Sequence, residues 1–422
     1  MPSIPAPLKI ADYRAFWAAR FFATVAGMML VIVIGWQVYD QARETMIPKD
    51  AAFLLGMIGL AQFLPLFGLS LVVGVIADRM DRRYIARAAL ALEAACALTL
   101  GWLALSGTVP MLSLFVVAVL LGVARAFVGP ALGALAPNLV PRALLPQAIA
   151  LNSISWQSGA VLGPPLGAFL YAIAPHVPYL VAAVLFGSAF ICLMMIGPVP
   201  RPPPSIVSPW RSLVDGISYV RHNRIVLGAI SLDLFAVLLG GATAMLPVYA
   251  RDVLHVGVEG LGPLRAAPAV GAVAMALLLA VRPLGRNVGP VMFACVGIFG
   301  LSTIVFGWST SYPLSLVALT VLGAADAVSV FVRGTLIQMH TPDEMRGRVS
   351  SVSGLFISAS NELGEFESGL AAAWVGAVPA VVVGGFGAIG VTVIWAWAFP
   401  ELRRADRFVV PDEIDAKAVT GV

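Results

Sequence analysis

Ionisable side chains lie inside stretches of this chain that are otherwise apolar. In such surroundings a charge is costly unless it is paired or hydrated, so each of these residues should face a partner or an aqueous path. A carboxyl group held there can also take up and release protons near neutral pH. The sequence therefore offers five candidates for proton coupling or for the lining of a polar cavity: Arg125, Asp233, Asp326, Glu362 and Glu365.

Arg125 and Asp326 occupy matching positions in two halves of the chain that look like repeats. Leu121-Gly122 and Leu322-Gly323 stand 201 residues apart, and the same offset carries Arg125 onto Asp326. Oppositely charged residues at equivalent depths can pair in one state and separate in another, which is the coupling that we favour. A permanent ion pair with other partners explains these two residues equally well.

Carboxyl groups gather in the eleventh apolar stretch. Ser358, Glu362 and Glu365 share one face of the helix expected there. Either one of these carboxyls exchanges protons, or the cluster lies at the external mouth, where it is hydrated and permanently ionised. Glu93 in the third stretch and Asp233 in the seventh are further candidates, and Asp233 is the better of the two.

Twelve apolar stretches carry these residues. The 422 residues are 60% hydrophobic and 11% charged, whereas soluble domains are usually about a quarter charged. Each stretch approaches the roughly 20 residues that cross a bilayer as a helix. The sequence therefore predicts an all-α membrane protein with twelve transmembrane helices in two pseudo-symmetric six-helix bundles. The expected spans are 16–39, 53–77, 85–105, 111–136, 148–173, 178–196, 225–249, 261–281, 291–308, 313–339, 349–374 and 379–399.

The basic residues follow this topology. Of the 26 Lys and Arg residues, 19 fall on the side of the N-terminus, three on the other side and four inside spans. This bias predicts that both termini are cytoplasmic. Because the basic residues do not cluster on one soluble face, the net charge of +4 gives no support to nucleic-acid binding.

A run of prolines divides the chain near its middle. We expect an N-terminal six-helix bundle over 1–198, a proline-rich cytoplasmic linker over 199–224, a C-terminal six-helix bundle over 225–400 and a cytoplasmic tail over 401–422. Within the linker, apolar residues from Trp210 to Val220 recur at helical spacing, which predicts an amphipathic helix on the membrane surface. A frayed loop is the alternative.

The loop between the second and third spans carries a dense motif. It contains Gly74, Asp78, Arg79, Arg82 and Arg83. This pattern resembles the G-x-x-x-D-R-x-G-R-R motif of the major facilitator superfamily, except that Asp81 replaces the second Gly. The resemblance implies a latch in which Gly74 allows close helix approach and Asp78 accepts hydrogen bonds or pairs with an arginine. A plain positive-inside loop would explain the arginines but not Asp78.

Three further segments resemble the same superfamily. Arg125 fits its l-x-x-x-R-x-x-x-G pattern in a cavity-lining helix. The segment from His340 to Val349 is similar to one found in a bacterial subgroup that includes enterobactin exporters and other small-molecule effluxers. The fifth span matches most of the G-x-x-x-G-P-x-x-G-G signature of exporting antiporters, through Gly159, Gly163, Pro164 and Gly167. Close helix packing and a bend are the structural consequences of that signature.

The resemblance implies a secondary active transporter of the bacterial inner membrane. We expect a proton-coupled exporter of a small amphipathic molecule, such as a drug or a siderophore, that works by alternating access. An uncoupled facilitator, an importer of a small metabolite and a non-transporting membrane sensor are the alternatives. The expected partners are the lipid bilayer, the substrate and protons. No nucleophile triad, metal-ligand pair or ATP-binding phosphate loop is present in the sequence, so we expect neither an enzyme nor a cofactor.

Overall fold

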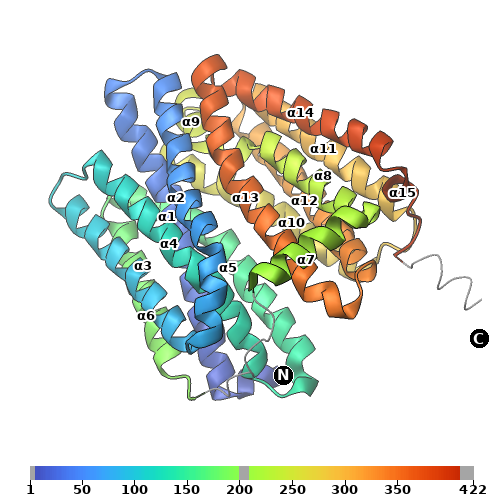
Figure 1. Cartoon of the computed structure of the whole chain (residues 1–422). Coiled ribbons are helices and arrows are strands. Elements are labelled where there is room, and N and C mark those ends of the chain that lie inside the picture. The colour runs from blue at the N-terminus through green and yellow to red at the C-terminus, as the bar shows by residue number, and fades with distance from the viewer. Residues whose placement is uncertain (1–4, 199–208, 409–422) are drawn as a thin grey trace, which may run out of the picture. The chain divides into compact units, whose positions relative to one another are not determined.

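The chain is built from helices, and Figure 1 shows their arrangement. The computed structural model describes residues 5–198 and 209–408, with their side chains except those of 70–79 and of positions 134, 209, 210, 212, 343 and 358. The long helices are α1 (Ala11–Thr45), α2 (Pro48–Arg79), α3 (Arg82–Leu105), α4 (Met111–Leu135), α5 (Leu145–Ile173), α6 (Val177–Met194), α7 (Pro209–His222), α8 (Arg224–Leu239), α10 (Gly257–Val281), α11 (Val288–Trp308), α12 (Tyr312–Met339), α13 (Asp343–Val375) and α14 (Ala377–Ala398). The short helix α15 (Pro400–Arg403) follows.

Ten of these helical segments in the described part of the chain are long and apolar enough to cross a membrane. The other two expected spans form the long helices α5 and α13, of 29 and 33 residues. Polar residues interrupt the apolar stretch of both helices. Helix α5 begins with amides and serines, and α13 carries three glutamates in its second half. A helix that lines a polar path inside a membrane protein needs less hydrophobicity than one surrounded by lipid.

The seventh span is not a continuous helix. Helix α8 ends at Leu239, and after Gly240 and Gly241 the chain continues as the 3₁₀ turn η4 (Ala242–Met245), the short helix α9 (Leu246–Val248) and the π-helical turn η5 (Tyr249–Val253). A side chain at Gly241 would collide with Ser368 and with the Gly364 carbonyl of α13. The break therefore lies where two backbones meet closely, as glycine permits.

The helices form two compact units. The first holds residues 1–209 together with Leu246–Ala266, and the second holds Trp210–Met245 together with Ala267–Val422. The break after Leu239 thus precedes a segment of the chain's second half that packs with the first unit. The expected boundaries at 198, 224 and 400 remain a prediction, and the prolines from 199 to 208 lie outside the described residues.

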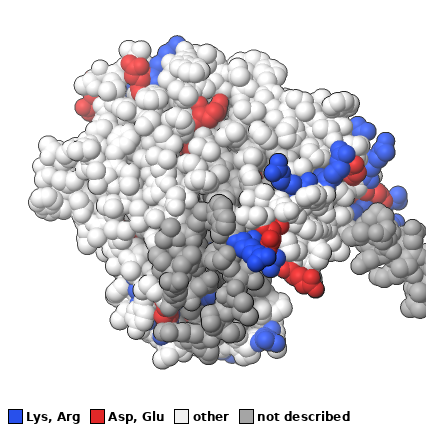
Figure 2. Space-filling model, viewed as in Figure 1, with Lys and Arg blue, Asp and Glu red and all other residues white. Residues whose placement is uncertain are grey.

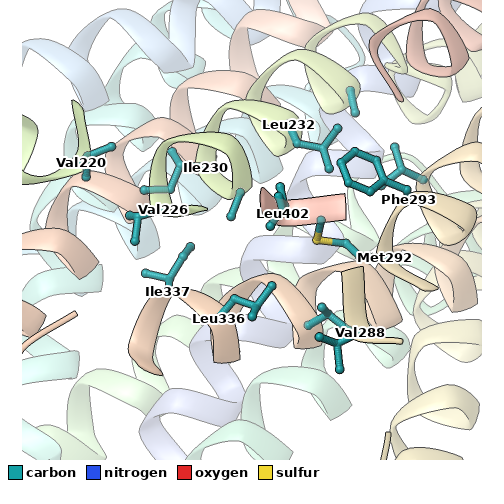
Figure 3. Packing of buried hydrophobic residues seen from close by; sticks show 14 of the residues in the cluster. Val220, Val226, Ile230, Leu232, Val288, Met292, Phe293, Leu336, Ile337 and Leu402 are labelled. Carbon is teal, nitrogen blue, oxygen red and sulfur yellow. The ribbon is translucent and has the colours of Figure 1, made fainter. Parts of the chain in front are cut away.

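A hydrophobic cluster forms the core of the second unit (Figure 3). Leu232 of α8, Phe293 of α11 and Leu336 of α12 are fully or almost fully buried in it. Leu402 of α15 also belongs to it, and Val220 brings α7 into the same cluster. Helix α7 therefore uses its apolar face to pack on helices of this unit.

Polar contacts hold α7 on α13 as well. Asp215 pairs with Arg348 at 3.0 Å, and a side chain at Gly216 would press on the Arg348 carbonyl. The Tyr219 hydroxyl donates to the His340 carbonyl at the end of α12. The amphipathic helix expected in the linker is present, and these contacts fix its position within the second unit.

In the first unit, glycines bring α5 against α1. A Cβ at Gly159 would lie 2.7 Å from the Thr24 side chain. A Cβ at Gly163 would lie 2.7 Å from the Met28 Cβ, and one at Gly167 would lie 2.7 Å from the Met29 side chain. The glycines of the fifth-span signature thus form one side of a close helix pair.

We expect Gly163→Ala to destabilise the protein by about 1–3 kcal/mol, because the added methyl group has no room against α1. The measurement is the midpoint of thermal unfolding in detergent. Gly187→Ala is the matched control, since nothing lies within 4 Å of a Cβ at that position of α6. Equal midpoints for the two variants would contradict the close packing.

Candidate functional site

Two acids and one arginine meet in the interior of the second unit. The Arg333 Nη2 atom of α12 lies 2.7 Å from the Asp233 Oδ1 atom of α8, and each side chain is only 7% exposed. The Arg333 Nη1 atom also donates to the Ser329 Oγ atom at 3.3 Å. Arg333 and Asp233 are the charged groups that act on the Asp326 carboxylate. The structure thus brings together two of the acids that the sequence singled out.

Helical spacing explains why α12 supplies three members of this cluster. Asp326, Ser329 and Arg333 follow at intervals of three and four residues, which places them on one face of the helix. On α8, Asp233 faces this side of α12. It stands one turn before Ala236, which also lines the site. A partner at close range is what a buried arginine requires in a membrane interior.

A small cavity separates the polar groups. Asp233, Asp326, Ser329 and Arg333 line it, with Phe299 of α11 as an apolar wall. Its volume is about 10 Å³, which is close to the minimum for one water molecule. Four polar partners at such a space satisfy the other requirement for a bound water. The site can therefore accommodate a hydrogen-bonded bridge between the two carboxyl groups.

The charges of this cluster do not balance when both acids are ionised. Asp233 and Asp326 then carry two negative charges against the single positive charge of Arg333. An excess charge in a low-dielectric interior is unfavourable, and one added proton removes it. Arginine side chains stay charged in proteins, so a proton that balances the cluster would reside on a carboxyl group.

Arg125 lies in the first unit with a different set of neighbours. Its Nη1 atom donates to the Gln62 side chain of α2 at 2.8 Å. Its charge also acts on Glu93 of α3, a residue that is 5% exposed and whose Oε2 atom has no hydrogen-bond partner among the described residues. The described contacts of Arg125 are therefore with α2 and α3, and its pairing with Asp326 remains a prediction.

The glutamates in the second half of α13 are half-buried. Glu362 and Glu365 each interact with other groups of the protein, so neither is an isolated charge. Glu367 is also half-buried, and Ser368 donates to the Gly241 carbonyl at the break after α8. The side chain of Ser358 lies outside the described residues. A proton-binding role for Glu362 and Glu365 remains a prediction.

The motif after the second span is described only in part. Gly74, Asp78 and Arg79 belong to α2, but their side chains lie outside the described residues. Asp81 accepts a hydrogen bond from the Arg83 backbone N–H at the start of α3. It also pairs with the Arg83 guanidinium at 2.7 Å. The residue that departs from the superfamily motif is therefore a helix cap and an ion-pair partner.

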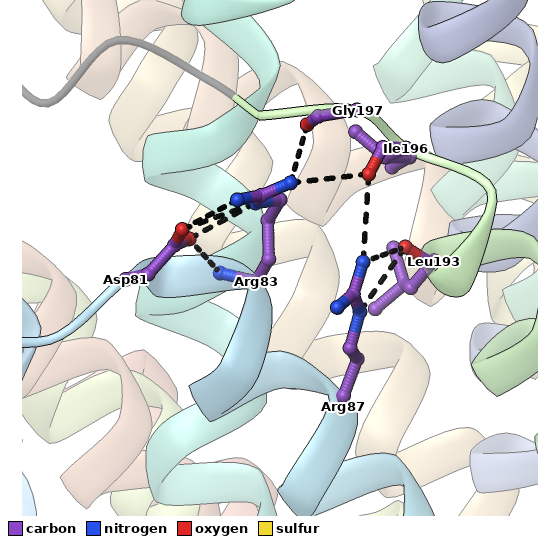
Figure 4. Close-up of polar contacts among 6 residues, drawn as sticks. All are labelled: Asp81, Arg83, Arg87, Leu193, Ile196 and Gly197. Carbon is purple, nitrogen blue, oxygen red and sulfur yellow. Dashed lines mark hydrogen bonds and ion pairs between the residues drawn. The ribbon is translucent and has the colours of Figure 1, made fainter.

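Arginines of this motif and of α3 join the ends of two helices, as Figure 4 shows. Arg83 donates to the carbonyls of Ile196 and Gly197, and Arg87 donates to the Leu193 carbonyl at 2.8 Å. Leu193 belongs to the last turn of α6, and Ile196 and Gly197 follow it, in a region where carbonyls lack the usual i to i+4 helical partners. Arg83 and Arg87 thus fasten the start of α3 to the end of α6.

Ion pairs fasten the segment after the break to the C-terminal end of α1. Arg43 lies 2.9 Å from Asp252, and the Tyr39 hydroxyl donates to the same carboxylate. Arg251 pairs with Asp40 and also donates to its backbone carbonyl. All five residues belong to the first unit.

We expect Asp252→Asn to loosen this segment, because the charge that holds both Arg43 and Tyr39 is lost. The pair is partly exposed, so we expect an effect of about 1 kcal/mol, or roughly a fivefold increase in local opening. Hydrogen–deuterium exchange of the peptide that contains 246–256 measures it. Glu44→Gln removes the same charge from an exposed position of α1 and should leave the exchange unchanged.

Sequence reasoning missed the central member of the site. Arg333 counted only as one of four arginines inside spans, although an acid stands two turns before it on the same helix face. The spacing of two helical turns between Asp326 and Arg333 was the signal in the sequence that could have identified this residue. Gln62 gave no signal, because an amide in a span becomes informative only once its partner is known.

Comparisons with known proteins cover most of the chain. A family model described as Major Facilitator Superfamily matches residues 16–290. The enterobactin exporters of Citrobacter koseri and of Escherichia coli O1:K1 are both 27% identical over 399 residues, which are 93% of this chain and 92% of each relative.

Solved structures share the fold. A D-xylose–proton symporter matches with a TM-score of 0.71 at 15% identity, over 93% of this chain and 98% of that one. A bacterial homologue of the human lysosomal transporter Spinster, in an inward-facing and occupied conformation, matches with a TM-score of 0.71 at 14% identity over the same shares. At these identities the structures establish the fold alone.

Proposed function

We propose that this chain, which belongs to the Major Facilitator Superfamily of membrane transporters, exports a small amphipathic molecule in exchange for protons. The observation that carries the proposal is the cluster of Asp233, Asp326 and Arg333 in the second unit. A buried acid, Asp233, and a half-buried acid, Asp326, that share one arginine form a site whose charge one proton can balance. A secondary transporter driven by protons needs such a site.

Protonation of Asp326 changes the ion-pair partners that are open to Arg333. With both acids ionised, Asp326 of α12 competes with Asp233 of α8 for the guanidinium of Arg333, which weakens the contact between the two helices. When Asp326 takes up a proton, Arg333 is left to Asp233 alone. A shift in the pairing of two helices is the kind of local charge change that biases a two-state transporter.

Two observations support export as the direction. Two relatives that match nearly the whole chain are enterobactin exporters. In addition, Gly159, Gly163 and Gly167 pack α5 closely on α1, as the signature of exporting antiporters implies. A siderophore or a drug of similar amphipathic character is the proposed cargo class. The cargo would move between two six-helix bundles, 1–198 and 225–400, by alternating access.

We place the protein in the bacterial inner membrane with both termini in the cytoplasm, as the distribution of Lys and Arg favours. In this orientation the motif with Gly74, Asp78, Arg79, Arg82 and Arg83 lies on the cytoplasmic side. Its proposed role is to hold one conformation until the cluster in the second unit changes its protonation state. Asp81 and Arg83 contribute by fixing the start of α3.

The test is the accumulation of dyes, antibiotics and siderophores in an efflux-deficient host that expresses this chain, with and without a protonophore. We expect lower accumulation of at least one compound, and we expect the protonophore to abolish the difference. Protonophore-insensitive equilibration would favour an uncoupled facilitator, and raised accumulation would favour an importer. Either result would contradict coupled export.

A further inference from the structure

We propose that an arginine patch on the second unit binds the headgroups of anionic phospholipids. The patch is defined by Arg224, Arg282, Arg286, Arg403, Arg404 and Arg407, all of which are exposed. Figure 2 shows blue side chains gathered over the α15 end of this unit, beside a broad white surface. The six arginines come from three separate segments of the chain, and the fold brings these segments together.

Specific contacts fix the three segments. The Asn287 backbone N–H donates to the Asp406 carboxylate at 3.0 Å, and the Gly289 N–H donates to the Ala405 carbonyl at 2.9 Å. A side chain at Gly289 would collide with the Leu402 carbonyl. On the other side, the Arg224 Nη2 atom donates to the Ala398 carbonyl at 3.0 Å. The backbone segments that carry these arginines are therefore packed against one another.

The patch has more positive charge than its own acids neutralise. Asp406 lies between Arg286 at 3.8 Å and Arg407 at 3.7 Å. Glu401 lies 3.4 Å from Arg224. The remaining arginines, 282, 403 and 404, form no ion pair within the described residues. Guanidinium groups bind phosphate oxygens in pairs of parallel hydrogen bonds, so three such groups favour a phosphate-bearing ligand.

The position of the patch favours a lipid as the source of that phosphate. Val281, the last residue of α10, is 79% exposed, and Trp397 near the end of α14 is 81% exposed. In a membrane protein, exposed apolar side chains at helix ends face lipid, with tryptophan at the headgroup level. Arg282 directly follows Val281, and Arg403 and Arg404 come one short helix after Trp397. They therefore lie at the depth of the lipid phosphates, where each basic residue contributes about 1 kcal/mol of attraction to anionic lipid.

The chain itself offers a competing occupant. Residues 409–422, which lie outside the described part, contain Asp412, Glu413 and Asp415. The arrangement favours lipid over this tail, since the patch adjoins exposed apolar surface that a phospholipid's acyl chains can cover and that an acidic peptide cannot. Removal of the tail distinguishes the two occupants.

The experiment uses the full chain reconstituted in bilayers with spin-labelled phosphatidylglycerol or spin-labelled phosphatidylcholine. Electron paramagnetic resonance gives the fraction of each lipid that the protein holds at its surface. We expect a several-fold preference for phosphatidylglycerol, and we expect the triple variant R282Q/R403Q/R404Q to lose most of it. The control K9Q/R14Q/R142Q removes the same charge from exposed positions of the first unit and should keep the preference.

Two outcomes would overturn the proposal. The first is an equal loss of preference in the patch variant and in the control variant, which would show that net charge alone attracts the lipid. The second is a several-fold rise in preference after deletion of 409–422, which would show that the acidic tail occupies the patch in the intact chain. We expect the deletion to leave the preference unchanged.

Discussion

An Asp326→Asn variant should fold, reach the membrane and fail to export its cargo against a gradient. Asparagine has nearly the same shape as aspartate but neither binds nor releases a proton, so the site stays in one charge state. Arg333 then keeps Asp233 as its partner, and the balanced pair preserves stability. We expect accumulation in cells that express the variant to equal that in cells without the transporter.

Ser329→Ala is the matched control for this variant. It removes a hydrogen-bond partner of Arg333 from the same helix face but no titratable group. We expect it to weaken export only in part. If Asp326→Asn exported normally while Ser329→Ala did not, the hydrogen-bonded geometry rather than the acid would be the important feature, and the coupling role of Asp326 would be lost.

The Arg333→Gln variant should be severely destabilised. It leaves Asp233 and Asp326 facing each other in the interior without a cation. Removal of one partner from a buried ion pair typically costs about 3–5 kcal/mol. We expect a low yield of folded protein at neutral pH and a lower midpoint of thermal unfolding in detergent. The loss should diminish as the pH is lowered, because protonation removes the repulsion between the two carboxylates.

A second substitution distinguishes the loss of the Arg333 charge from the loss of its side-chain packing. Asp233→Asn added to Arg333→Gln removes one negative and one positive charge together, so we expect most of the stability to return. Export should stay absent, since the remaining Asp326 has no arginine whose pairing it can change. A double variant as unstable as Arg333→Gln alone would mean that Arg333 acts through packing, not through its charge.

The fold was largely predictable from the sequence because membrane spans carry a strong hydropathic signal. All twelve expected stretches are helical, including α5 and α13, whose polar residues keep them outside the set of ten strongly apolar helices. The break after Leu239 was not predicted. Two adjacent glycines were visible, but their effect depends on the close approach of Ser368 and Gly364 of α13, which only the folded chain supplies.

The site was predictable in its residue types but less so in its partners. Asp233 and Asp326 were identified because acids in spans need compensation. The favoured pairing of Asp326 with Arg125 came from internal symmetry, which indicates equivalent depth but not which side chains meet. In the structure, Arg333 two turns along α12 is the arginine beside Asp326, and Arg125 bonds Gln62. Helix geometry thus identifies the neighbour of Asp326 within α12, whereas its pairing with Arg125 remains a prediction.

The most direct test of proton coupling is a measurement of protons exchanged by the purified transporter. The protein is placed in weakly buffered detergent solution, and a cargo identified by the accumulation assay is added while the pH is recorded. We expect cargo binding to release protons from wild-type protein and none from Asp326→Asn. Equal release from both proteins would place the proton elsewhere, and no release from wild type would contradict coupled exchange.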